Sequence, residues 1–350
     1  MLAIRYRKVN ACGSWTIFFS LAILTSTSGW SAEAIANLTP ARETAVPLGL
    51  DSPIAIPDDN PSTPEKIALG RKLFFDPILS RNSSISCSSC HVPDHGFGGD
   101  VSLPTGIEKR KGRRNAPSLL NRAYSESLFW DGRVATLEAQ ALQPIQNPTE
   151  MGASLEEVLQ RLRSNPDYER AFKVAFADGI SATNMARALA SYERTLLTGN
   201  SAVDRFHDGN VTALSESARQ GLWLFESRSL CWKCHSGRNF TDEKFHNTGV
   251  SSGKIPADRG RFEVTGKEED QGRFKTPTLR NVAKTGPYMH DGGLATLREV
   301  VEFYSRGGTP NPNLDPFVKP LNFSDNDIQN LVDFLEALTG ETPGGHESQH

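Results

Sequence analysis

The sequence has few cysteines and methionines, no long hydrophobic run and no block of like charges. Five cysteines and four methionines occur among 350 residues, and the formal net charge is −3. Because basic blocks are absent and the charge is slightly negative, we expect no nucleic-acid partner. The composition, with 37% hydrophobic and 23% charged residues, is typical of a globular protein of about two domains.

The N-terminal residues differ from the rest of the chain. Three basic residues precede a short apolar run over 15–24, and Ala32-Glu33-Ala34 resembles a signal-peptidase site. We therefore expect a signal peptide over 1–34, export to the periplasm, and no stable membrane insertion after cleavage. The alternative is a membrane anchor, but the run is shorter than the roughly 20 residues that a spanning helix needs.

Four of the five cysteines lie in two Cys-x-x-Cys-His motifs, Cys87–His91 and Cys231–His235. The fifth, Cys12, would leave with the signal peptide, so no cysteine is left for a disulfide. Each motif is typical of covalent c-type haem attachment, in which two thiols bond to the haem and the histidine ligates its iron. A zinc ribbon or a redox dithiol is the alternative, but neither explains a histidine directly after both motifs. The sequence therefore predicts two covalently bound haem c groups, and export agrees with their attachment outside the bacterial inner membrane.

Helix signals recur along the chain, whereas no run of alternating strand pattern is present. Capping boxes begin helices at Ser154 and Thr296, and Ser181 can cap a helix that extends to about Leu197. The helix after Thr296 ends at Gly307-Gly308, and a last helix runs from Ser324 to near Gly340. The predicted fold class is mainly α.

An internal repeat accompanies the two motifs. Residues 117–137 align without gaps to 277–297, at a constant offset of 160 and with nine identical pairs. Because each copy follows its own motif, we expect two cytochrome c-like haem domains related by internal duplication. The expected division is an N-terminal arm over 35–63 that looks loose, a haem 1 domain over 64–205, a haem 2 domain over 206–342, and a tail over 343–350.

Differences between the copies indicate how the two haems differ. Tyr304 in the second copy corresponds, at the same offset, to Pro144 in the first. A phenolate is a hard anionic donor that suits Fe(III), whereas proline cannot ligate iron. We therefore expect haem 2 to be closed by His235 and Tyr304, and haem 1, held by His91, to be open over Pro144. The alternative is that Tyr304 is an ordinary core or surface tyrosine.

Two further residues are candidates for peroxide chemistry. An open haem that cleaves peroxide needs an acid–base group, and Glu150 lies six residues after Pro144. Trp130 aligns with His290 in the second copy, and a tryptophan buried between two redox centres can carry an electron. The simpler alternatives are a solvated glutamate and a packing tryptophan.

Taken together, these motifs resemble the bacterial di-haem cytochrome c peroxidase/MauG family from about residue 64 to 340. The resemblance rests on LGRKLFFDPILSRNSSISCSSCH, RRNAPSLLN, FWDGRVATLEAQ, NPTEMG and GRFKTPTLRNVAKTGPYMHDG. It implies a calcium ion between the haems, held by the Asn115 side chain and by backbone oxygens of Thr285 and Pro287. It also implies that Gln140, Pro144 and Glu150 lie over the open haem, with Trp130 between the haems.

Two departures place the chain within this family. The peroxidases carry a histidine where this chain has Ile107, and a methionine ligand of haem 2 where it has Tyr304. The remaining methionines of the mature chain, Met151, Met185 and Met289, lie elsewhere. Both departures resemble MauG and the di-haem enzymes of methanobactin cassettes.

The resemblance implies an H₂O₂-dependent oxidoreductase. Peroxide would produce a two-electron-oxidised, high-valent di-haem state, which oxidises tryptophan residues of a periplasmic partner protein. The alternative within the family is a cytochrome c peroxidase that reduces H₂O₂ to water with electrons from a small cytochrome or copper protein. A plain di-haem electron carrier is the non-enzymatic alternative, and it would require a sixth ligand at haem 1.

The other histidines have simpler interpretations. His95 and His246 are expected in loops with structural roles, and His290 is expected to form a hydrogen bond rather than ligate iron. Met289 beside it is the rival candidate for a haem 2 ligand. Solvent exposure is expected for His207, His346 and His350.

Overall fold

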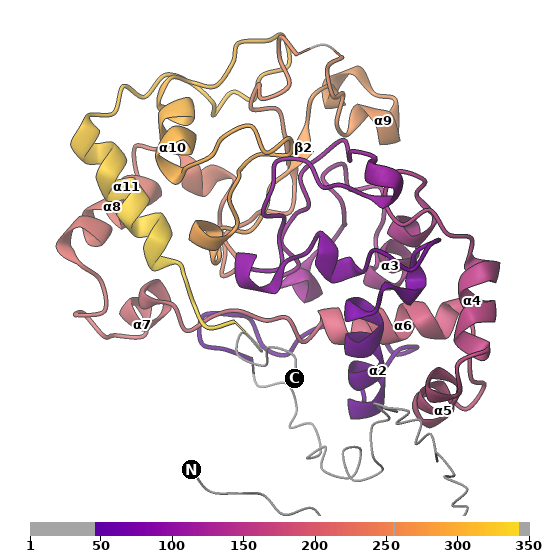
Figure 1. The fold of residues 1–350 in the computed structure, drawn as a ribbon. Helices are drawn as coiled ribbons and strands as arrows, with labels where there is room; N and C mark the ends of the chain where they lie inside the picture. Colours follow the sequence, from indigo (N-terminus) through magenta and orange to yellow (C-terminus); the bar gives the residue numbers. More distant parts are fainter. Residues whose placement is uncertain (1–45, 255, 343–350) are drawn as a thin grey trace, which may run out of the picture. The chain divides into compact units, whose positions relative to one another are not determined.

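The computed structural model describes residues 46–254 and 256–342, and this part of the chain is mainly helical (Figure 1). The predicted signal peptide over 1–34, the tail over 343–350, and His346 and His350 lie outside the described residues. The helices are α2 (Pro64–Phe75), α3 (Leu137–Gln146), α4 (Leu155–Arg163), α5 (Pro166–Ala175), α6 (Ala182–Glu193), α7 (Ala202–His207), α8 (Glu216–Glu226), α9 (Phe262–Thr265), α10 (Leu297–Ser305) and α11 (Asp325–Ala337). Short 3-10 turns are η1 (Pro77–Leu79), η2 (Cys87–Ser89), η3 (Pro93–His95), η4 (Ile107–Lys109), η5 (Arg122–Tyr124), η6 (Cys231–Lys233), η7 (Glu268–Asp270) and η8 (Val282–Lys284).

The predicted helix starts are confirmed by their capping hydrogen bonds. Ser154 and Thr296 each accept from the backbone three residues on, and Glu157 and Glu299 bond back to complete the capping boxes of α4 and α10. Ser324 begins α11 in the same way. Caps of this kind satisfy backbone N–H groups that would otherwise lack a partner in the first turn.

One local prediction was wrong, and one small feature was not predicted. The helix capped by Ser181 ends at Glu193 rather than near Leu197, because the chain turns there and the Leu196 carbonyl accepts a hydrogen bond from Asn121 N. A small antiparallel sheet also forms between β1 (Phe245–His246) and β2 (Phe274–Lys275). Strands of two residues are too short to produce an alternating sequence pattern, so the sequence could not predict them.

In each half of the chain, two helices cross and pack closely against each other at a glycine. In the first half α2 packs on α6, and in the second α8 packs on α11 (Figure 1). A Cβ atom on Gly70 would lie 1.9 Å from the Ala188 carbonyl oxygen, and one on Gly221 would lie 1.9 Å from that of Asn330. Only glycine allows backbones to approach this closely, so the two crossings are built alike.

The repeat also forms the same local contacts twice. Asn121 has a positive φ and bonds through its side chain to the backbone of Thr198, with distances of 2.8 and 3.1 Å. Asn281, its equivalent, also has a positive φ and bonds to the backbone of Gly340, at 2.8 and 3.4 Å. The predicted internal duplication is therefore present in three dimensions.

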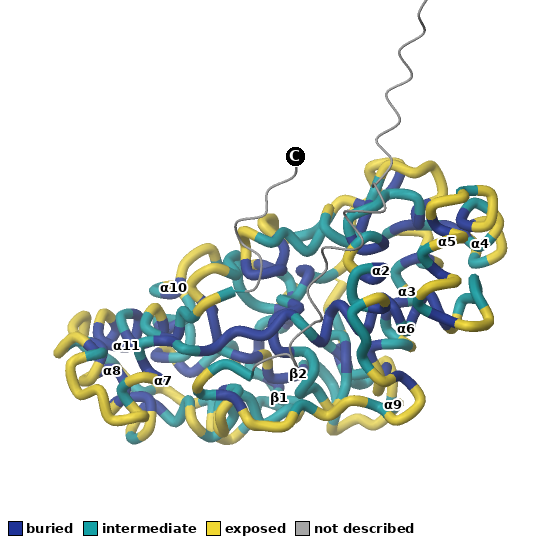
Figure 2. Tube along the Cα trace, turned by 90° about the horizontal axis from the view of Figure 1, so that it is seen from below, coloured by how far each residue is buried: buried dark blue, intermediate teal, exposed yellow. Residues whose placement is uncertain are grey.

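The apolar core consists mainly of two large clusters, one in each half. The first contains buried residues between Leu69 and Leu196, and the second contains those between Val203 and Leu338. Figure 2 shows buried residues where the helices of each half face one another and exposed residues on the outer loops. The domain boundaries given above remain predictions.

The described part of the N-terminal arm is not loose, contrary to expectation. The carbonyls of Leu48 and Gly49 accept hydrogen bonds from Asn200 and Arg280, and Asn60 is fully buried. Its side chain donates to Glu138 at 2.7 Å. The arm therefore joins residues from both halves of the chain.

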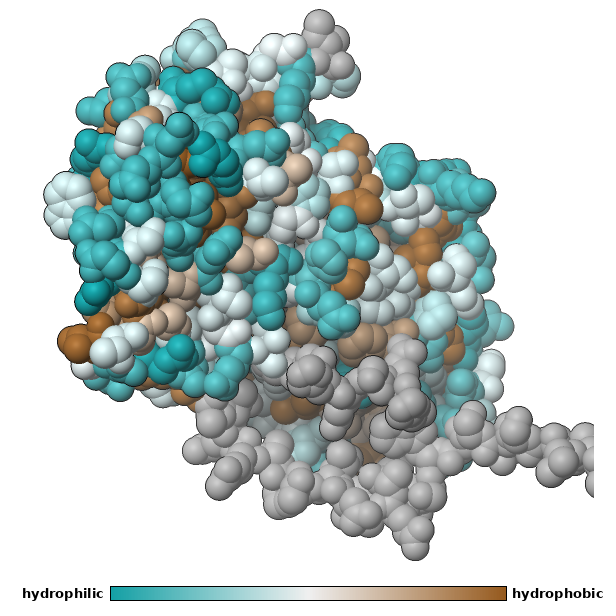
Figure 3. Space-filling view, turned by 60° about the vertical axis from the view of Figure 1, so that its left-hand side comes forward, coloured by the Kyte–Doolittle hydropathy of each residue, from teal (hydrophilic) through white to brown (hydrophobic). Residues whose placement is uncertain are grey.

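The surface is largely hydrophilic. On the face shown in Figure 3, hydrophobic residues lie in small groups between hydrophilic ones. This pattern is ordinary for globular proteins. None of the helices in residues 46–254 and 256–342 combines the length and apolar composition that crossing a bilayer requires.

Candidate active site

The two Cys-x-x-Cys-His motifs have the same local geometry. Each begins in a 3-10 turn, η2 or η6, and the histidine backbone N–H returns to the carbonyl of the first cysteine at 2.9 Å. The His91 Nδ1 lies 3.2 Å from the Phe97 carbonyl oxygen, and the His235 Nδ1 lies 3.0 Å from that of Phe240. A carbonyl can only accept, so each Nδ1 donates and each Nε2 keeps its lone pair for a metal.

Burial sets the charge state of these groups. It raises the pKa of the Cys87 thiol to about 12 and that of Cys231 to about 11. It lowers the pKa of both His91 and His235, so their imidazoles are neutral at pH 7. A neutral imidazole with a free Nε2 is the form that ligates iron.

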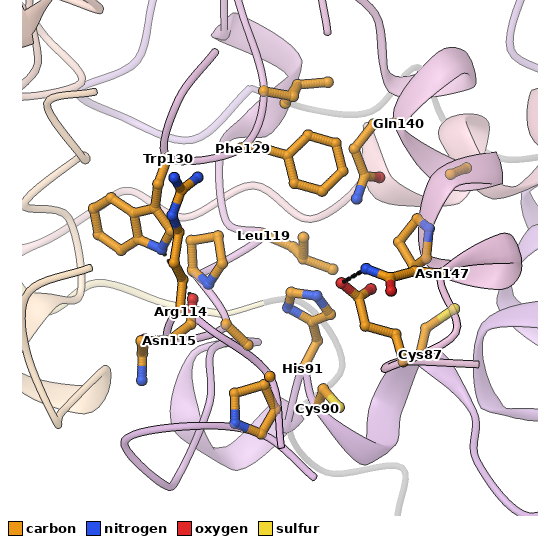
Figure 4. Close-up of a pocket in the computed structure, with 18 of the residues that line it drawn as sticks. Cys87, Cys90, His91, Arg114, Asn115, Leu119, Phe129, Trp130, Gln140 and Asn147 are labelled. Atoms are coloured by element: carbon orange, nitrogen blue, oxygen red, sulfur yellow. Dashed lines mark hydrogen bonds between the residues drawn. The ribbon is translucent and has the colours of Figure 1, made fainter. Parts of the chain in front are cut away.

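A cavity of about 630 Å³ surrounds the first motif. This volume falls within the roughly 300–1,000 Å³ typical of ligand sites. Figure 4 shows His91 near its centre, with Trp130 on one side and Gln140 and Asn147 on another. The lining includes Phe74, Cys87, Cys90, His91, Asn115, Leu119, Arg122, Phe129, Trp130, Gln140, Pro144, Asn147, Glu150, Leu189, Glu193, Lys275 and Pro277.

The structure brings together the residues predicted to lie over the open haem. Gln140 and Pro144 lie on α3, and both line the cavity together with Glu150. Asn147 donates to Glu150 Oε1 at 2.7 Å and fixes the carboxyl group. Burial raises the pKa of Glu150, although Arg133 and the Asn147 hydrogen bond oppose the shift. A carboxyl group with a raised pKa is suited to acid–base work near neutral pH.

No second histidine faces His91 across this cavity in the described part of the chain. Ile107, at the position where the peroxidases carry a histidine, is 1% exposed and does not line the cavity. Its backbone N–H bonds to the Glu150 carbonyl at 2.8 Å. Ile107 therefore supports the Glu150 segment and offers no ligand.

Trp130 lies at the seam between the two copies of the repeat. Its Nε1 donates to the Asn115 carbonyl at 2.9 Å, and the Asn115 N–H donates to the His290 carbonyl at 2.7 Å. The His290 ring stacks on Phe274 at a centroid distance of 3.5 Å, and its Nε2 lies 2.9 Å from Ser251 Oγ. His290 therefore forms the hydrogen bond expected of it.

Tyr304 projects from α10 toward the second motif. The sulfurs of Cys234 and Cys231 and the side chain of Thr248 are close enough to influence its hydroxyl. Burial raises the pKa of Tyr304 well above its usual value, and the Thr248 hydrogen bond only partly offsets this. Without a metal the side chain is thus a phenol, and a ferric ion would supply the charge needed to hold it as phenolate.

Comparison with known proteins identifies the family of this chain. The sequence pattern of the di-haem cytochrome c peroxidases matches residues 64–212. The methylamine utilization protein MauG of Methylorubrum extorquens is 40% identical over 287 residues, which cover 81% of each protein. The chain belongs to the di-haem cytochrome c peroxidase family.

Relatives named MauG and relatives named cytochrome c peroxidase both occur in this family. The cytochrome-c peroxidase IdrP1 of Denitromonas iodatirespirans is 37% identical and covers 86% of this chain and 88% of that protein. The crystal structure of a MauG-like protein associated with microbial copper homeostasis matches with a TM-score of 0.78 at 33% identity. It covers 85% of this chain and 95% of that one. The chain is therefore an enzyme, a di-haem oxidoreductase.

Membership of the family implies two c-type haems, and the cavity fits one. Two cysteines and a neutral imidazole provide the attachment points. Arg122 also lines the cavity. Its Nε donates to the Leu120 carbonyl, whereas its terminal nitrogens form no hydrogen bond with the described residues. Lys275, from the second half, also lines the cavity, but it already pairs with Glu243 at 2.5 Å. The guanidinium of Arg122 fits a carboxylate group of a haem.

Of the three predicted calcium ligands, Asn115 lies at the same seam. Asn115 is 6% exposed, and its Nδ2 donates to the carbonyls of Val101 and Ser102. Its Oδ1 accepts no hydrogen bond from the described residues, so this oxygen is available to a cation. Thr285 and Pro287 flank Gly286, and they lie five and three residues before His290, whose carbonyl accepts a hydrogen bond from Asn115 N–H.

The structure places His246 in a strand and not in a loop, so this prediction was wrong. It lies in β1, with Nδ1 2.6 Å from Asp315 Oδ2 and Nε2 3.0 Å from Asp242 Oδ2. Both nitrogens must donate, because carboxylates only accept, so His246 is an imidazolium. His207 is exposed, as expected. His95 is the last residue of the 3-10 turn η3 and is also exposed, so a structural role for it stays a prediction.

Sequence reasoning missed three residues of this site. Asn147 orients Glu150, Arg122 offers a free cation, and Glu193 contributes a buried carboxyl group. Asn147 could have been found from its place in the NPTEMG motif, directly after α3. No sequence signal marks Arg122 or Glu193, because their importance comes from which elements surround them.

Proposed function

We propose that this protein is a periplasmic, H₂O₂-dependent oxidase of MauG type, whose substrate is a partner protein oxidised at tryptophan residues. Its sites would be two haems attached through the two motifs, the first open and the second closed by His235 and Tyr304. One calcium ion would lie at Asn115, Thr285 and Pro287. Periplasmic location rests on the predicted signal peptide and on the attachment of c-type haem after export.

The observation that carries this proposal is the difference between Tyr304 and its repeat equivalent Pro144, each of which lies near the haem motif of its own half. Tyr304 approaches the cysteines of the second motif from α10. Pro144, its repeat equivalent, faces the first cavity and cannot ligate iron. An anionic oxygen ligand favours the oxidised state of a haem, whereas an open position admits peroxide.

The side chains of the first cavity would divide the work on peroxide. His91 would hold the haem iron through Nε2. Glu150 takes a proton from one peroxide oxygen and returns it to the other, and Gln140 orients the peroxide by hydrogen bonding. The haems supply the redox chemistry when bound, accepting electrons from the partner and passing them to peroxide.

Trp130 would connect the two centres. Its indole is fixed by the bond to Asn115 and by the rigid neighbourhood of His290 and Phe274. An aromatic ring held in this way can pass an electron without a change of shape. The partner would then be oxidised at the protein surface and need not enter the first cavity.

The test is to add one equivalent of H₂O₂ to the protein with both haems fully ferric. Optical and EPR spectra should show that both haems lose their ferric signals together, without prior reduction, and that the oxidised state persists for minutes. A ferric protein that is inert until haem 2 has been reduced would contradict the proposal.

The second candidate is a detoxifying cytochrome c peroxidase. It is favoured by the 37% identity to a protein named as such, which is close to the 40% identity to MauG. The absence of a second histidine among the described cavity-lining residues opposes it. Rapid turnover of H₂O₂ with a reduced small cytochrome or copper protein would establish it instead.

A further inference from the structure

One buried carboxyl group in the first cavity has no role in the scheme above. Glu193 is the last residue of α6, is 5% exposed, and lines the cavity that contains His91 and Glu150. Its Oε2 is buried and has no hydrogen-bond partner in the described part of the chain. Native proteins rarely leave such an atom unpaired, so its position needs an explanation.

The neighbouring charges do not neutralise Glu193. Arg194 turns toward α3 and pairs with Glu138, at 2.7 Å. The other ionisable groups facing Glu193 are Tyr192 on its own helix and Cys87, whose sulfur carries no charge once it is bonded to haem.

The group is therefore a neutral acid at pH 7. Burial raises the pKa of Glu193 to about 8, with Arg194 opposing the shift and Glu138 adding to it. An ionised carboxylate in this place would lack any donor to replace water. The chain thus keeps one exchangeable proton inside the wall of the peroxide cavity.

We propose that Glu193 is the second proton-carrying residue of this cavity and acts beside Glu150. The inference rests on the proposed peroxide chemistry. Over a full turnover, reduction of H₂O₂ to two waters breaks the O–O bond and consumes two electrons, which the partner supplies through the haems, and two protons beyond the pair that peroxide brings. These two protons are taken up when the electrons of the partner return to the oxidised protein. Glu150 moves a proton between the peroxide oxygens and gains none overall. Glu193 supplies one of the two additional protons, becomes a carboxylate, and is reprotonated by solvent, which also supplies the other.

The first experiment measures the proton directly. Infrared spectra of the protein with both haems attached should contain the carbonyl stretch of a protonated carboxylic acid at pH 7, and this band should disappear as the pH rises through 8. Glu193→Gln should lack the band, and Glu193→Asp should shift it. Absence of a titrating band in the native protein overturns the inference even if no variant folds.

The second experiment measures, as a function of pH, the rate at which the peroxide-oxidised protein is reduced again by a small electron donor, which is the step that takes up the two protons. The native rate should fall as Glu193 ionises above about pH 8. Glu193→Gln should react about 10²-fold more slowly and lose this alkaline limb, and Glu193→Asp should restore it in part. Glu156→Gln, on the exposed face of α4, is the matched control and should behave as the native protein.

The outcomes separate this inference from the proposed function. If Glu193→Gln keeps the native rate and pH profile while Glu150→Gln loses activity, the inference is overturned and the peroxide chemistry stands. If the native protein with both haems does not react with peroxide, the proposed function fails, and the infrared band alone decides whether Glu193 carries a proton.

Discussion

The indole of Trp130 meets the imidazole of His290 edge to face, at a ring-centroid distance of 6.4 Å and an angle of 70°. The two residues occupy equivalent positions in the two copies of the repeat, at an offset of 160. The duplication therefore brings equivalent turns of the two copies together. The first copy has an indole at this position and the second has an imidazole. Burial lowers the pKa of His290 to about 4, so this ring is neutral at pH 7.

The position of Trp130 predicts the effect of removing the indole. Before peroxide is added, the spectra of both haems in Trp130→Phe should match those of the native protein. One equivalent of H₂O₂ should then react at haem 1 alone. The EPR signal of haem 2 should then persist after peroxide is added, since no ring of low oxidation potential connects the centres. Trp223→Phe, at an exposed position on α8, is the matched control. Simultaneous loss of both signals in Trp130→Phe would exclude this role.

The geometry around Glu150 predicts a loss of peroxide reactivity. Glu150→Gln keeps the shape and the partner Asn147 but removes the acid–base group, so the bimolecular rate with H₂O₂ should fall by about 10²–10⁴-fold. Stopped-flow absorbance measures this rate. Cyanide affinity should change much less, because the cavity stays open. Native-like reactivity of Glu150→Gln would assign the proton transfer to another group.

Tyr304 offers a spectroscopic prediction. Tyr304→Phe should change the optical and EPR spectra of haem 2 and open its iron to CO after reduction, because the sixth ligand is lost. Tyr304→Met should close the site again and raise the midpoint potential of haem 2. An unchanged haem 2 spectrum in Tyr304→Phe would show that Tyr304 is not a ligand and would favour Met289.

The two carboxylates that bond to His246 predict that the stability of the fold depends on pH. Burial lowers the pKa of His246, but hydrogen bonds to the Cys234 sulfur, Asp315 and Asp242 outweigh it and raise the pKa to about 10. The sulfur contributes less once it is bonded to haem, which leaves the two carboxylates as the main cause. A raised histidine pKa stabilises the fold fully below the unfolded value of 6.5, and this contribution is lost as the pH rises toward 10.

The matching variant is His246→Gln. It should reduce the free energy of unfolding by about 1.5–3 kcal/mol at pH 6, as expected for hydrogen bonds to charged groups. The difference from the native protein should shrink steadily between pH 6.5 and 10. Urea titrations at several pH values measure this, and His207→Gln at an exposed site should show no such trend. A pH-independent difference would mean that His246 contributes only by packing.

The sequence was sufficient to predict features encoded by neighbouring residues. The two haem motifs, the gapless repeat and the capping boxes of α4 and α10 each lie within a short segment, so spacing alone reveals them. Family resemblance then brought Gln140, Pro144 and Glu150 together, and the structure places all three along one cavity. The mainly α fold followed from the same signals.

Features that depend on distant residues could not be predicted. His246 meets Asp315 across 69 positions of sequence, and Glu193 is buried only because α6 packs against α2 and α3. The arm was expected to be loose because its composition is rich in Pro, Ala and Thr, yet Arg280 binds the Gly49 carbonyl across 231 positions. Local composition describes propensity, whereas these contacts are decided by tertiary packing.

The buried thiols dictate an order of assembly for the protein. A thiolate is the reactive form of cysteine, and in the folded chain the pKa of Cys87 is about 12 and that of Cys231 about 11, so almost none is present at neutral pH. A finished fold would thus be a poor acceptor for its own prosthetic groups. We therefore expect each haem to be bonded while the cysteines of its motif are still exposed, before that half of the chain folds around it.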